Sequence, residues 1–490
     1  MGTAPRHSYW LTRLCFQRAL AFIYFIAFLA TARQFGALVG ERGLLPLPFY
    51  LKHAPFWSGP SLFYLHSSDA FTAFVAWSGV ALSVLALTGL SERFGIWLST
   101  AVWSVLWLFY LSFVNVGQVF YGFGWETMTL EAGFLAIFLG SSRTRAPAVL
   151  IWLLRWVLFR LMFGAGLIKL RGDDCWRDLT CMFHHYQTQP IPNPLSWYFH
   201  HLPPLAHKIE TLCTHFVEIA VPWGYFAAGA AASAAGALTV LFQVLLILSG
   251  NLSWLNYLTI TIAISCFDDK ALGRFLPLRP PAATAPPITG ARWWVLAVYT
   301  GLVAVLSVAP VLNMISPRQM MNASFEPFHL VNTYGAFGSV TQRRTEVILE
   351  GTDHAVPSAG AVWKEYGFKA KPGDVRRTLP VVAPYHLRLD WLMWFAAMSD
   401  WRHHPWILPL IGRLLQNDPA TLRLIAENPF PDHPPRFIRA TLYGYRFTTP
   451  GERKATGDLW VREALVRYFP PVSLENGDFR NVLDELGWRE

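Results

Sequence analysis

The stretch AVLIWLLRWVLFRLMFGAGLI, residues 148–168, decides the fold. Crossing a bilayer as a helix takes roughly 20 predominantly apolar residues, and this stretch meets that requirement. Similar stretches occur elsewhere along the chain, at 14–32, 70–90, 95–114, 205–227, 229–249 and 293–312, with two shorter ones at 126–140 and 252–267. The sequence therefore predicts a polytopic α-helical membrane bundle of eight or nine transmembrane helices.

The composition agrees with a chain that faces lipid. Hydrophobic residues make up 53% of the chain and charged residues only 14%, whereas soluble domains carry about 25% charge. The net charge of +9 predicts no nucleic-acid partner, because Lys and Arg are scattered between apolar spans and form no single basic stripe. No A-x-A-like cleavage site follows the first span, 14–32, so we expect it to remain as an anchor.

The distribution of basic residues predicts the orientation, because cytoplasmic loops of membrane proteins carry an excess of Lys and Arg. With the N-terminus inside, segments 115–125 and 250–256 lie outside, and neither contains Lys or Arg. The inside segments then hold Arg6, Arg13, Arg93, Arg143, Arg145, Lys270, Arg274, Arg279 and Arg292. Nine spans would place the C-terminus outside, in the periplasm of a bacterium or the lumen of the endoplasmic reticulum.

A change in composition near residue 313 predicts a second domain. The Pro- and Ala-rich segment 277–291 indicates a loop, and past residue 313 charged residues become frequent and no further span is possible. We divide the chain into a membrane domain, 1–312, and a water-exposed α+β domain, 313–490. In the latter, periodicity predicts strands at 345–350, 362–369 and 437–447, and helices at 387–398, at 407–416 and from Asp418-Pro419 onward.

Cys175 and Cys181 lie in the loop after residues 148–168, on the predicted outer side, where disulfides form. A bond between them would close a short loop and add roughly 2 kcal/mol of stability in the chain-entropy picture. Two free thiols and a redox-active pair remain as alternatives, although the spacing is not C-x-x-C. The other cysteines fall in apolar spans and are expected to be buried packing residues: Cys15, Cys213 and Cys266.

Glu126 and Glu131 are ionisable residues at the head of a short span, and such residues are costly inside a bilayer. Five positions apart on a helix, they point ~140° away from each other, so we do not expect a catalytic carboxylate pair. Helix capping and ion pairing are the simpler roles, with Arg155 and Arg160 as candidate partners. Arg155 could instead extend to the cytoplasmic face.

His207, Glu210, His215 and Glu218 form two H-x-x-E pairs within 205–227. Residues three apart share a helix face, so a metal site is conceivable. The second pair is displaced from the first, which favours hydrogen bonds between helices instead. We therefore predict no metal centre.

Seven long blocks of the sequence resemble the lipase maturation factor family. The most specific is FGAGLIKLRGDDCWRDLTCMFHHYQTQPIPNP, residues 163–194. The others are residues 124–139, 197–203, 326–340, 365–371, 386–396 and 428–447. Eukaryotic members of this family are polytopic endoplasmic reticulum proteins that help certain secreted lipases fold and assemble into active dimers. The resemblance implies a membrane-bound, non-enzymatic folding factor without a cofactor, whose partner is a client lipase or other secreted protein.

A shorter likeness supplies an alternative. Residues 165–176, AGLIKLRGDDCW, are similar to a segment of the vitamin K-dependent carboxylase family that provides a catalytic lysine. This likeness implies an integral membrane enzyme with Lys169 as general base and a lipid-soluble cofactor. The simpler role for Lys169 is an interfacial anchor paired with Asp173 or Asp174.

Other function classes lack their motifs. The sequence contains no G-x-S-x-G, Walker A, G-x-G-x-x-G or H-E-x-x-H pattern, which disfavours a lipase, an ATP-driven pump and a zinc protease. We see no inverted repeat of the kind that transporters carry. Two aromatic-rich segments, 391–395 and 401–406, could contact a client or could form part of the core of the second domain.

Overall fold

The computed structural model describes residues 9–278, 288, 290–358 and 360–488. Within these residues, six helical segments are long and apolar enough to cross a membrane. They are α1 (Trp10–Val39), α3 (Asp69–Leu87), α5 (Ile96–Val116), α7 (Ala148–Arg171), α12 (Ala230–Ser249) and the consecutive helices α15 (Ala291–Leu306) and α16 (Val308–Ile315). The chain is thus an integral, multi-pass membrane protein, as its hydropathy predicted.

The three other predicted spans form shorter or broken helices. Residues 126–140 fall in α6 (Gly124–Leu139), and 252–267 fall in α13 (Leu255–Ala263) with the 3-10 turn η6 (Ile264–Cys266). The predicted span 205–227 is helical over most of its length but is not one α-helix. This segment divides into α11 (Pro204–His215), the π-helical turn η4 (Phe216–Ala220) and the 3-10 turn η5 (Val221–Phe226).

Short helices connect the longer ones: α2 (Leu47–His53), α4 (Leu90–Arg93), α8 (Asp174–Arg177), α9 (Met182–Thr188), α10 (Ser196–His200) and α14 (Asp269–Leu272). Helix α1 lies inside the bundle and packs against α3, α6 and α13. Its buried aromatic residues, Tyr24 and Phe28, meet Tyr110 of α5 edge-on. Of the predicted loop 277–291, residues 279–287 and 289, and with them Arg279, lie outside the described residues, as does Arg6.

One end of the bundle gathers several basic residues that were predicted to lie inside. The Arg13 guanidinium donates to the carbonyl of Thr144, and Arg292 donates to the carbonyl of Arg145. Asp269 accepts from the backbone N–H groups at the start of α1. These contacts bring the N-terminus of α1, the α6–α7 loop, α14 and the start of α15 to the same end.

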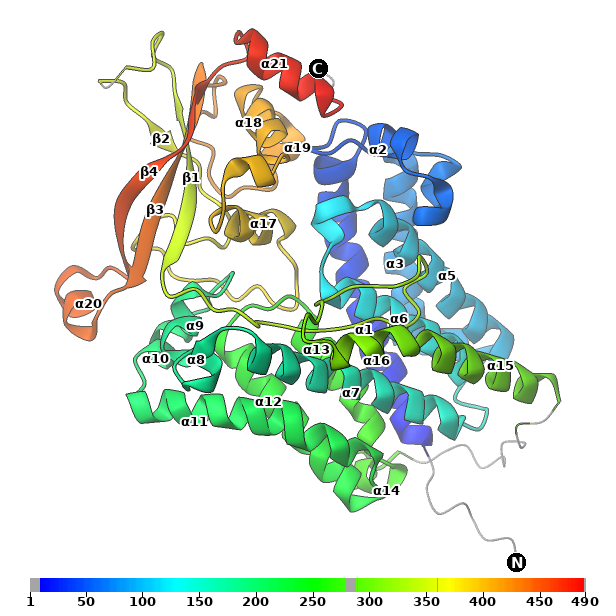
Figure 1. The fold of residues 1–490 in the computed structure, drawn as a ribbon. Coiled ribbons are helices and arrows are strands. Elements are labelled where there is room, and N and C mark those ends of the chain that lie inside the picture. Colours follow the sequence, from blue (N-terminus) through cyan, green and yellow to red (C-terminus); the bar gives the residue numbers. More distant parts are fainter. Residues whose placement is uncertain (1–8, 279–287, 289, 359, 489–490) are drawn as a thin grey trace, which may run out of the picture.

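The opposite end of the bundle carries the C-terminal domain. Asn115, at the end of α5, donates to the carbonyls of Pro60 and Pro327. Asn251, which follows α12, donates to the carbonyl of Pro380, and Gln34 of α1 donates to that of His386. The domain is therefore attached to the loops that were predicted to lie outside (Figure 1).

The described part of this domain contains one antiparallel sheet in the order β2-β1-β3-β4. Its strands are β1 (Arg344–Thr352), β2 (Lys364–Glu365), β3 (Phe437–Phe447) and β4 (Trp460–Val472). β1 pairs with β3 from Arg344↔Tyr445 to Thr352↔Phe437. The predicted strand at 362–369 shortens to the two residues of β2, whereas β4 was not predicted.

Three helices lie between the sheet and the bundle in Figure 1: α17 (Arg388–Ala396), α18 (Ile407–Leu415) and α19 (Pro419–Leu422). Each falls where periodicity predicted a helix, and Asp418 caps α19 as expected. Trp391 and Trp406 are buried, so these members of the two aromatic-rich segments belong to the core. The remaining helices of the domain are α20 (Pro450–Thr456) and α21 (Gly477–Glu485).

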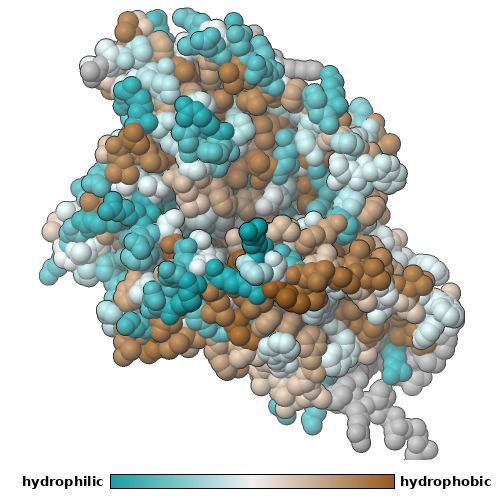
Figure 2. Space-filling view, in the orientation of Figure 1, coloured by the Kyte–Doolittle hydropathy of each residue, from teal (hydrophilic) through white to brown (hydrophobic). Residues whose placement is uncertain are grey.

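The surface is apolar where the bundle is uncovered. Figure 2 shows hydrophobic side chains gathered along α15 and α16 and hydrophilic ones more densely over the sheet domain. Val298 and Leu312, for example, are each more than 60% exposed. Large contiguous apolar surfaces are unfavourable in water, so we interpret this band as facing lipid.

Candidate functional site

A cavity of about 380 Å³ lies between the helical bundle and the C-terminal domain. Its walls come from α6, α7, α9, η4, α12, α13 and α17, together with residues 334–341. Most of the lining is apolar and includes Met162, Phe242, Trp391 and Trp394, and a few polar side chains interrupt it. This combination of an apolar wall with a small number of polar groups is typical of ligand pockets, which measure about 300–1,000 Å³.

The charged group of the lining is an ion pair between Lys169 and Glu218. The Lys169 ammonium donates to both carboxylate oxygens of Glu218 at 2.8 Å, and both residues are buried. The ammonium also lies 5.4 Å from the centre of the Trp176 ring, within the range of a cation–π contact. In this arrangement the Lys169 side-chain nitrogen is held by the Glu218 carboxylate through two hydrogen bonds.

The predicted pairing of Lys169 with Asp173 or Asp174 was wrong. Asp173 accepts from the backbone N–H of Val340 at 2.8 Å, and Asp174 pairs with Arg177. Helical side chains lean toward the N-terminus of their helix. Lys169, at the end of α7, therefore extends back into the bundle rather than forward onto the loop.

Two local sequence features place Glu218 against Lys169. Pro222 has no N–H to give to the carbonyl of Glu218 four residues earlier, and its ring crowds that carbonyl. The helix widens there into the π-turn η4, and such turns are frequent at functional sites. On α7, Gly166 permits close approach, because a Cβ at this position would lie 2.5 Å from Cδ1 of Ile219 and 3.0 Å from Cβ of Glu218.

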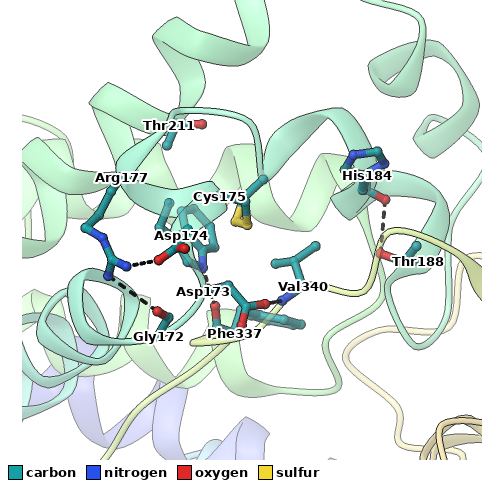
Figure 3. Close-up of a disulfide and its surroundings, with 12 residues drawn as sticks. Gly172, Asp173, Asp174, Cys175, Arg177, His184, Thr188, Thr211, Phe337 and Val340 are labelled. Atoms are coloured by element: carbon teal, nitrogen blue, oxygen red, sulfur yellow. Dashed lines mark hydrogen bonds and ion pairs between the residues drawn. A yellow bond between two sulfur atoms is a disulfide. The ribbon is translucent and has the colours of Figure 1, made fainter.

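Cys175 and Cys181 form a disulfide beside the cavity. The loop they close contains Trp176, whose indole N–H donates to the carbonyl of Phe337 at 2.9 Å. Figure 3 shows Asp173, two residues before this loop, directed at Val340, while Arg177 turns toward Asp174 and Gly172. The disulfide thus holds a loop that is fastened to cavity-lining residues 337–340.

The histidines near the cavity make separate contacts. His207 pairs with Glu210 at 3.0 Å, whereas His215 binds the carbonyl of Trp176 at 3.0 Å and leaves Glu218 to Lys169. His185 lines the cavity, and its burial lowers its pKa to about 4, so it is uncharged at neutral pH. Across the described residues, no three His, Cys, Asp or Glu side chains are placed to hold a metal ion together.

Glu131 is the centre of a fully packed polar cluster. It pairs with Arg160 of α7, accepts from the Tyr334 hydroxyl at 2.6 Å, and accepts from the Asn332 side chain at 3.1 Å. All four residues are buried. The cluster joins α6 and α7 to residues near the start of the C-terminal domain.

Glu126 belongs to a second buried cluster, away from Glu131. The guanidinium of Arg388, from α17, donates to the Glu126 carboxylate at 2.7 Å and to the carbonyl of Phe120 at 2.7 Å. The Tyr110 hydroxyl donates to the other carboxylate oxygen. The two glutamates of α6 therefore do not converge, and each binds a residue of the C-terminal part of the chain.

Arg155 contacts neither glutamate and does not extend to the surface. Its guanidinium donates to the carbonyls of Ser265 at 2.9 Å and Tyr225 at 3.1 Å. It is buried and holds η5 and η6 against α7. Cys213 lies exposed on α11, so the prediction that this cysteine is buried was wrong.

Sequence reasoning missed the partners that come from the C-terminal part of the chain: Asn332, Tyr334, His386 and Arg388. A signal for them was present. A buried glutamate needs a cation or several donors, and the blocks 326–340 and 386–396 supply both. The sequence pattern does not reveal which donor binds which glutamate, because each glutamate and its C-terminal donors are more than 200 positions apart.

Comparison with known proteins gives matches along nearly the whole chain. Residues 11–274 match the family model described as the lipase maturation factor transmembrane domain, and residues 330–470 match the lipase maturation factor C-terminal domain. No solved structure matches.

Three relatives illustrate the extent of the similarity. The chain is 46% identical to lipase maturation factor 1 of Bos taurus, covering 98% of this chain and 92% of that protein. It is 44% identical to lipase maturation factor 1 of Homo sapiens, covering 99% and 92%. The identity to lipase maturation factor 2 of Homo sapiens is 29%, covering 98% and 85%. The chain therefore belongs to the lipase maturation factor family.

Proposed function

We propose that this protein is a membrane-bound folding and assembly factor for secreted lipases and that it acts as a chaperone without a catalytic step of its own. The observation that carries the proposal is the 44–46% identity, over nearly the full length, to proteins named lipase maturation factor 1. Binding partly folded client chains would keep their apolar surfaces from aggregating and would favour productive assembly.

The attachment of the C-terminal domain supports this role. Two buried polar clusters, one around Glu126 and one around Glu131, fasten residues of that domain to α6. A client-binding surface on the domain would thus be held at a fixed place above the bundle. The carboxylase alternative finds no support in the comparisons, and Lys169 is engaged by Glu218.

The charges at the two ends of the bundle support an orientation for the chain. We propose nine crossings, with the end that contains Arg13 and Arg292 in the cytoplasm and the C-terminal domain in the lumen of the endoplasmic reticulum, or in the periplasm of a bacterium. The contacts of Arg13 with Thr144 and of Arg292 with Arg145 support this proposal, because they group predicted inside loops together.

The test of function is the activity of a secreted lipase per lipase molecule, in cells that lack a maturation factor and receive this gene or an empty vector. We expect specific activity to rise with the gene, while the activity per molecule of a secreted enzyme of another class stays unchanged. Lys169→Gln should restore lipase activity as well as wild type does. Equal specific activity with and without the gene would refute the folding role, and loss of activity with Lys169→Gln at a wild-type level of folded protein would favour lysine chemistry.

A glycosylation experiment tests the orientation. Lys454→Asn on the exposed helix α20 creates the acceptor Asn-Ala-Thr, and Ser142→Asn in the α6–α7 loop creates Asn-Arg-Thr. Translated into endoplasmic reticulum membranes, only the Lys454→Asn chain should gain a glycan, because acceptor sites are modified in the lumen. A glycan on the Ser142→Asn chain alone would reverse the proposed topology.

A further inference from the structure

The cavity beside Lys169 and Glu218 carries an inference that goes beyond the proposed folding role. Its lining is drawn from helices of the bundle and from α17 of the C-terminal domain. A volume of about 380 Å³ lies near the lower end of the usual range for small-ligand pockets. An apolar space of this size takes one hydrocarbon chain more readily than the two chains of a membrane phospholipid.

The position of the cavity favours a ligand from the bilayer. Helix α12 contributes Phe242 and Leu246 to the cavity wall, while Leu241 and Leu245 of the same helix are exposed on its outer face. Since α12 is one of the apolar helices long enough to span a membrane, a single helix separates this part of the cavity from lipid. Phe395 of α17 and Met398, in the turn after this helix, line the cavity and are also partly exposed.

The electrostatics of the lining favour an uncharged polar head. Among the described lining residues, Lys169 and Glu218 are the charged ones, and they neutralise each other at 2.8 Å. The amides of Gln243 and Asn256 are hydrogen-bonded to each other at 2.7 Å. A carboxylate or phosphate head would have to displace Glu218 from Lys169. A hydroxyl, by contrast, both donates and accepts and could join the existing pair.

We propose that this cavity binds a single-chain lipid with an uncharged, hydroxyl-bearing head, the chain lying among the aromatic and methionine side chains and the head at the Lys169–Glu218 pair. Nothing in the proposed lipase-folding role requires such a ligand. The binding site is a property of the chain itself and is tested without a lipase.

The test compares three probes that share the oleoyl chain, on the purified full-length protein in detergent, by native mass spectrometry and by equilibrium binding. The probes are monooleoylglycerol (one chain, uncharged head), oleate (one chain, anionic head) and dioleoylglycerol (two chains). We expect monooleoylglycerol to bind saturably, one molecule per chain, and at least ten times more tightly than either of the others. Equal or tighter binding of oleate or of dioleoylglycerol would overturn the proposed head or the proposed single chain.

Two variants of α12 locate the site. Leu246→Trp fills the cavity from its wall and should abolish saturable binding of monooleoylglycerol. Leu245→Trp makes the same change on the neighbouring outward-facing residue and should leave binding within twofold of wild type. Binding that survives Leu246→Trp in the folded protein would place the lipid elsewhere and overturn the proposal.

A charge variant tests where the polar head of the lipid binds, and it does so without a substitution at Leu246. Glu218→Gln removes the carboxylate that neutralises Lys169, so the preference should shift toward oleate by at least tenfold in the ratio of the two affinities. The double variant Lys169→Met/Glu218→Gln restores a neutral wall and should restore the preference for monooleoylglycerol. An unchanged ratio in Glu218→Gln would show that the head does not lie at this pair.

Discussion

Two regions of this protein hold buried ion pairs that differ in what surrounds them. Around Glu126 and Glu131 the charges are packed against tyrosines, an amide and backbone carbonyls, and the pairs join the bundle to the C-terminal part of the chain. The Lys169–Glu218 pair faces a cavity. Among the described contacts, the two side chains bind each other, and the Lys169 ammonium also lies over the Trp176 ring. The first region fastens two parts of the fold, and the second leaves polar groups available to a ligand.

The largest effect is expected from breaking the pair between Glu126 and Arg388, both of which are fully buried. Arg388→Met leaves the Glu126 carboxylate without its cation, and removing one partner of a buried pair costs about 3–5 kcal/mol. Thermal unfolding of the purified full chain should show this as a large fall in midpoint.

Two controls sharpen that prediction. The double variant Glu126→Gln/Arg388→Met should recover much of the loss, because no buried charge remains unpaired. Arg402→Met removes a cation from an exposed pair with Asp400 and should cost at most about 1 kcal/mol. If Arg388→Met unfolds no earlier than Arg402→Met, the packed region is not a structural joint.

Acid should weaken the same region through His386. Burial and the neighbouring Arg388 lower the pKa of His386 to about 4, although Glu126 opposes this. Because the folded pKa lies below the unfolded value of 6.5, the unfolded chain takes up the proton first as pH falls. Stability is therefore lost between about pH 6.5 and pH 4, by up to about 3 kcal/mol for this group.

The measurement is the slope of stability against pH in that window. His386→Phe keeps an aromatic ring among Phe123, Trp125 and Trp391 and should show a shallower slope. His403→Gln, at an exposed position, should keep the wild-type slope. Other buried histidines such as His185 also reduce stability as the pH falls. The contribution of His386 is therefore measured as the difference in slope between His386→Phe and wild type. Identical slopes for His386→Phe and wild type would contradict the prediction.

The disulfide should have an intermediate effect, confined to the cavity side. The double variant Cys175→Ala/Cys181→Ala releases a short loop, and we expect a loss of roughly 2 kcal/mol in chemical unfolding. Binding of monooleoylglycerol should weaken as well, because Trp176 lines the cavity. Cys213→Ser, at an exposed position on α11, serves as the control and should change neither quantity. A loss of stability without any change in binding would show that the disulfide loop does not contribute to lipid binding in the cavity.

The sequence predicted what depends on local pattern. Apolar length located the membrane helices, and periodicity with the Asp418 cap located α17, α18 and α19. The break at Pro222 was missed because the apolar count over 205–227 ignores the effect of proline on the preceding turn. The strand β4 was missed as well, because its middle is exposed and carries charges, so its alternation is weak.

The cavity could not be predicted, because its walls join residues from Gly122 to Met398. The sequence shows which residues are polar but not which of them pair. The partner of Lys169 lies 49 positions away on a different helix. Proximity in sequence favoured Asp173 and Asp174, which the backbone directs elsewhere. Knowledge of helix packing, and not of residue types alone, was needed to identify Glu218.

The smallest effect on stability is expected at the cavity pair, and this prediction decides whether the two regions really differ. Lys169→Met/Glu218→Gln replaces both charges with neutral side chains of similar length. Such replacements of buried pairs are often neutral or stabilising, so we expect a change within about 1 kcal/mol in thermal unfolding. The single variant Lys169→Met should cost less than Arg388→Met, because the Glu218 carboxylate beside a cavity can gain a proton or a water molecule. If the double variant instead destabilises the protein as strongly as Arg388→Met does, the cavity pair is a structural joint of the same kind, and the contrast between a fastened region and a ligand-accessible one fails.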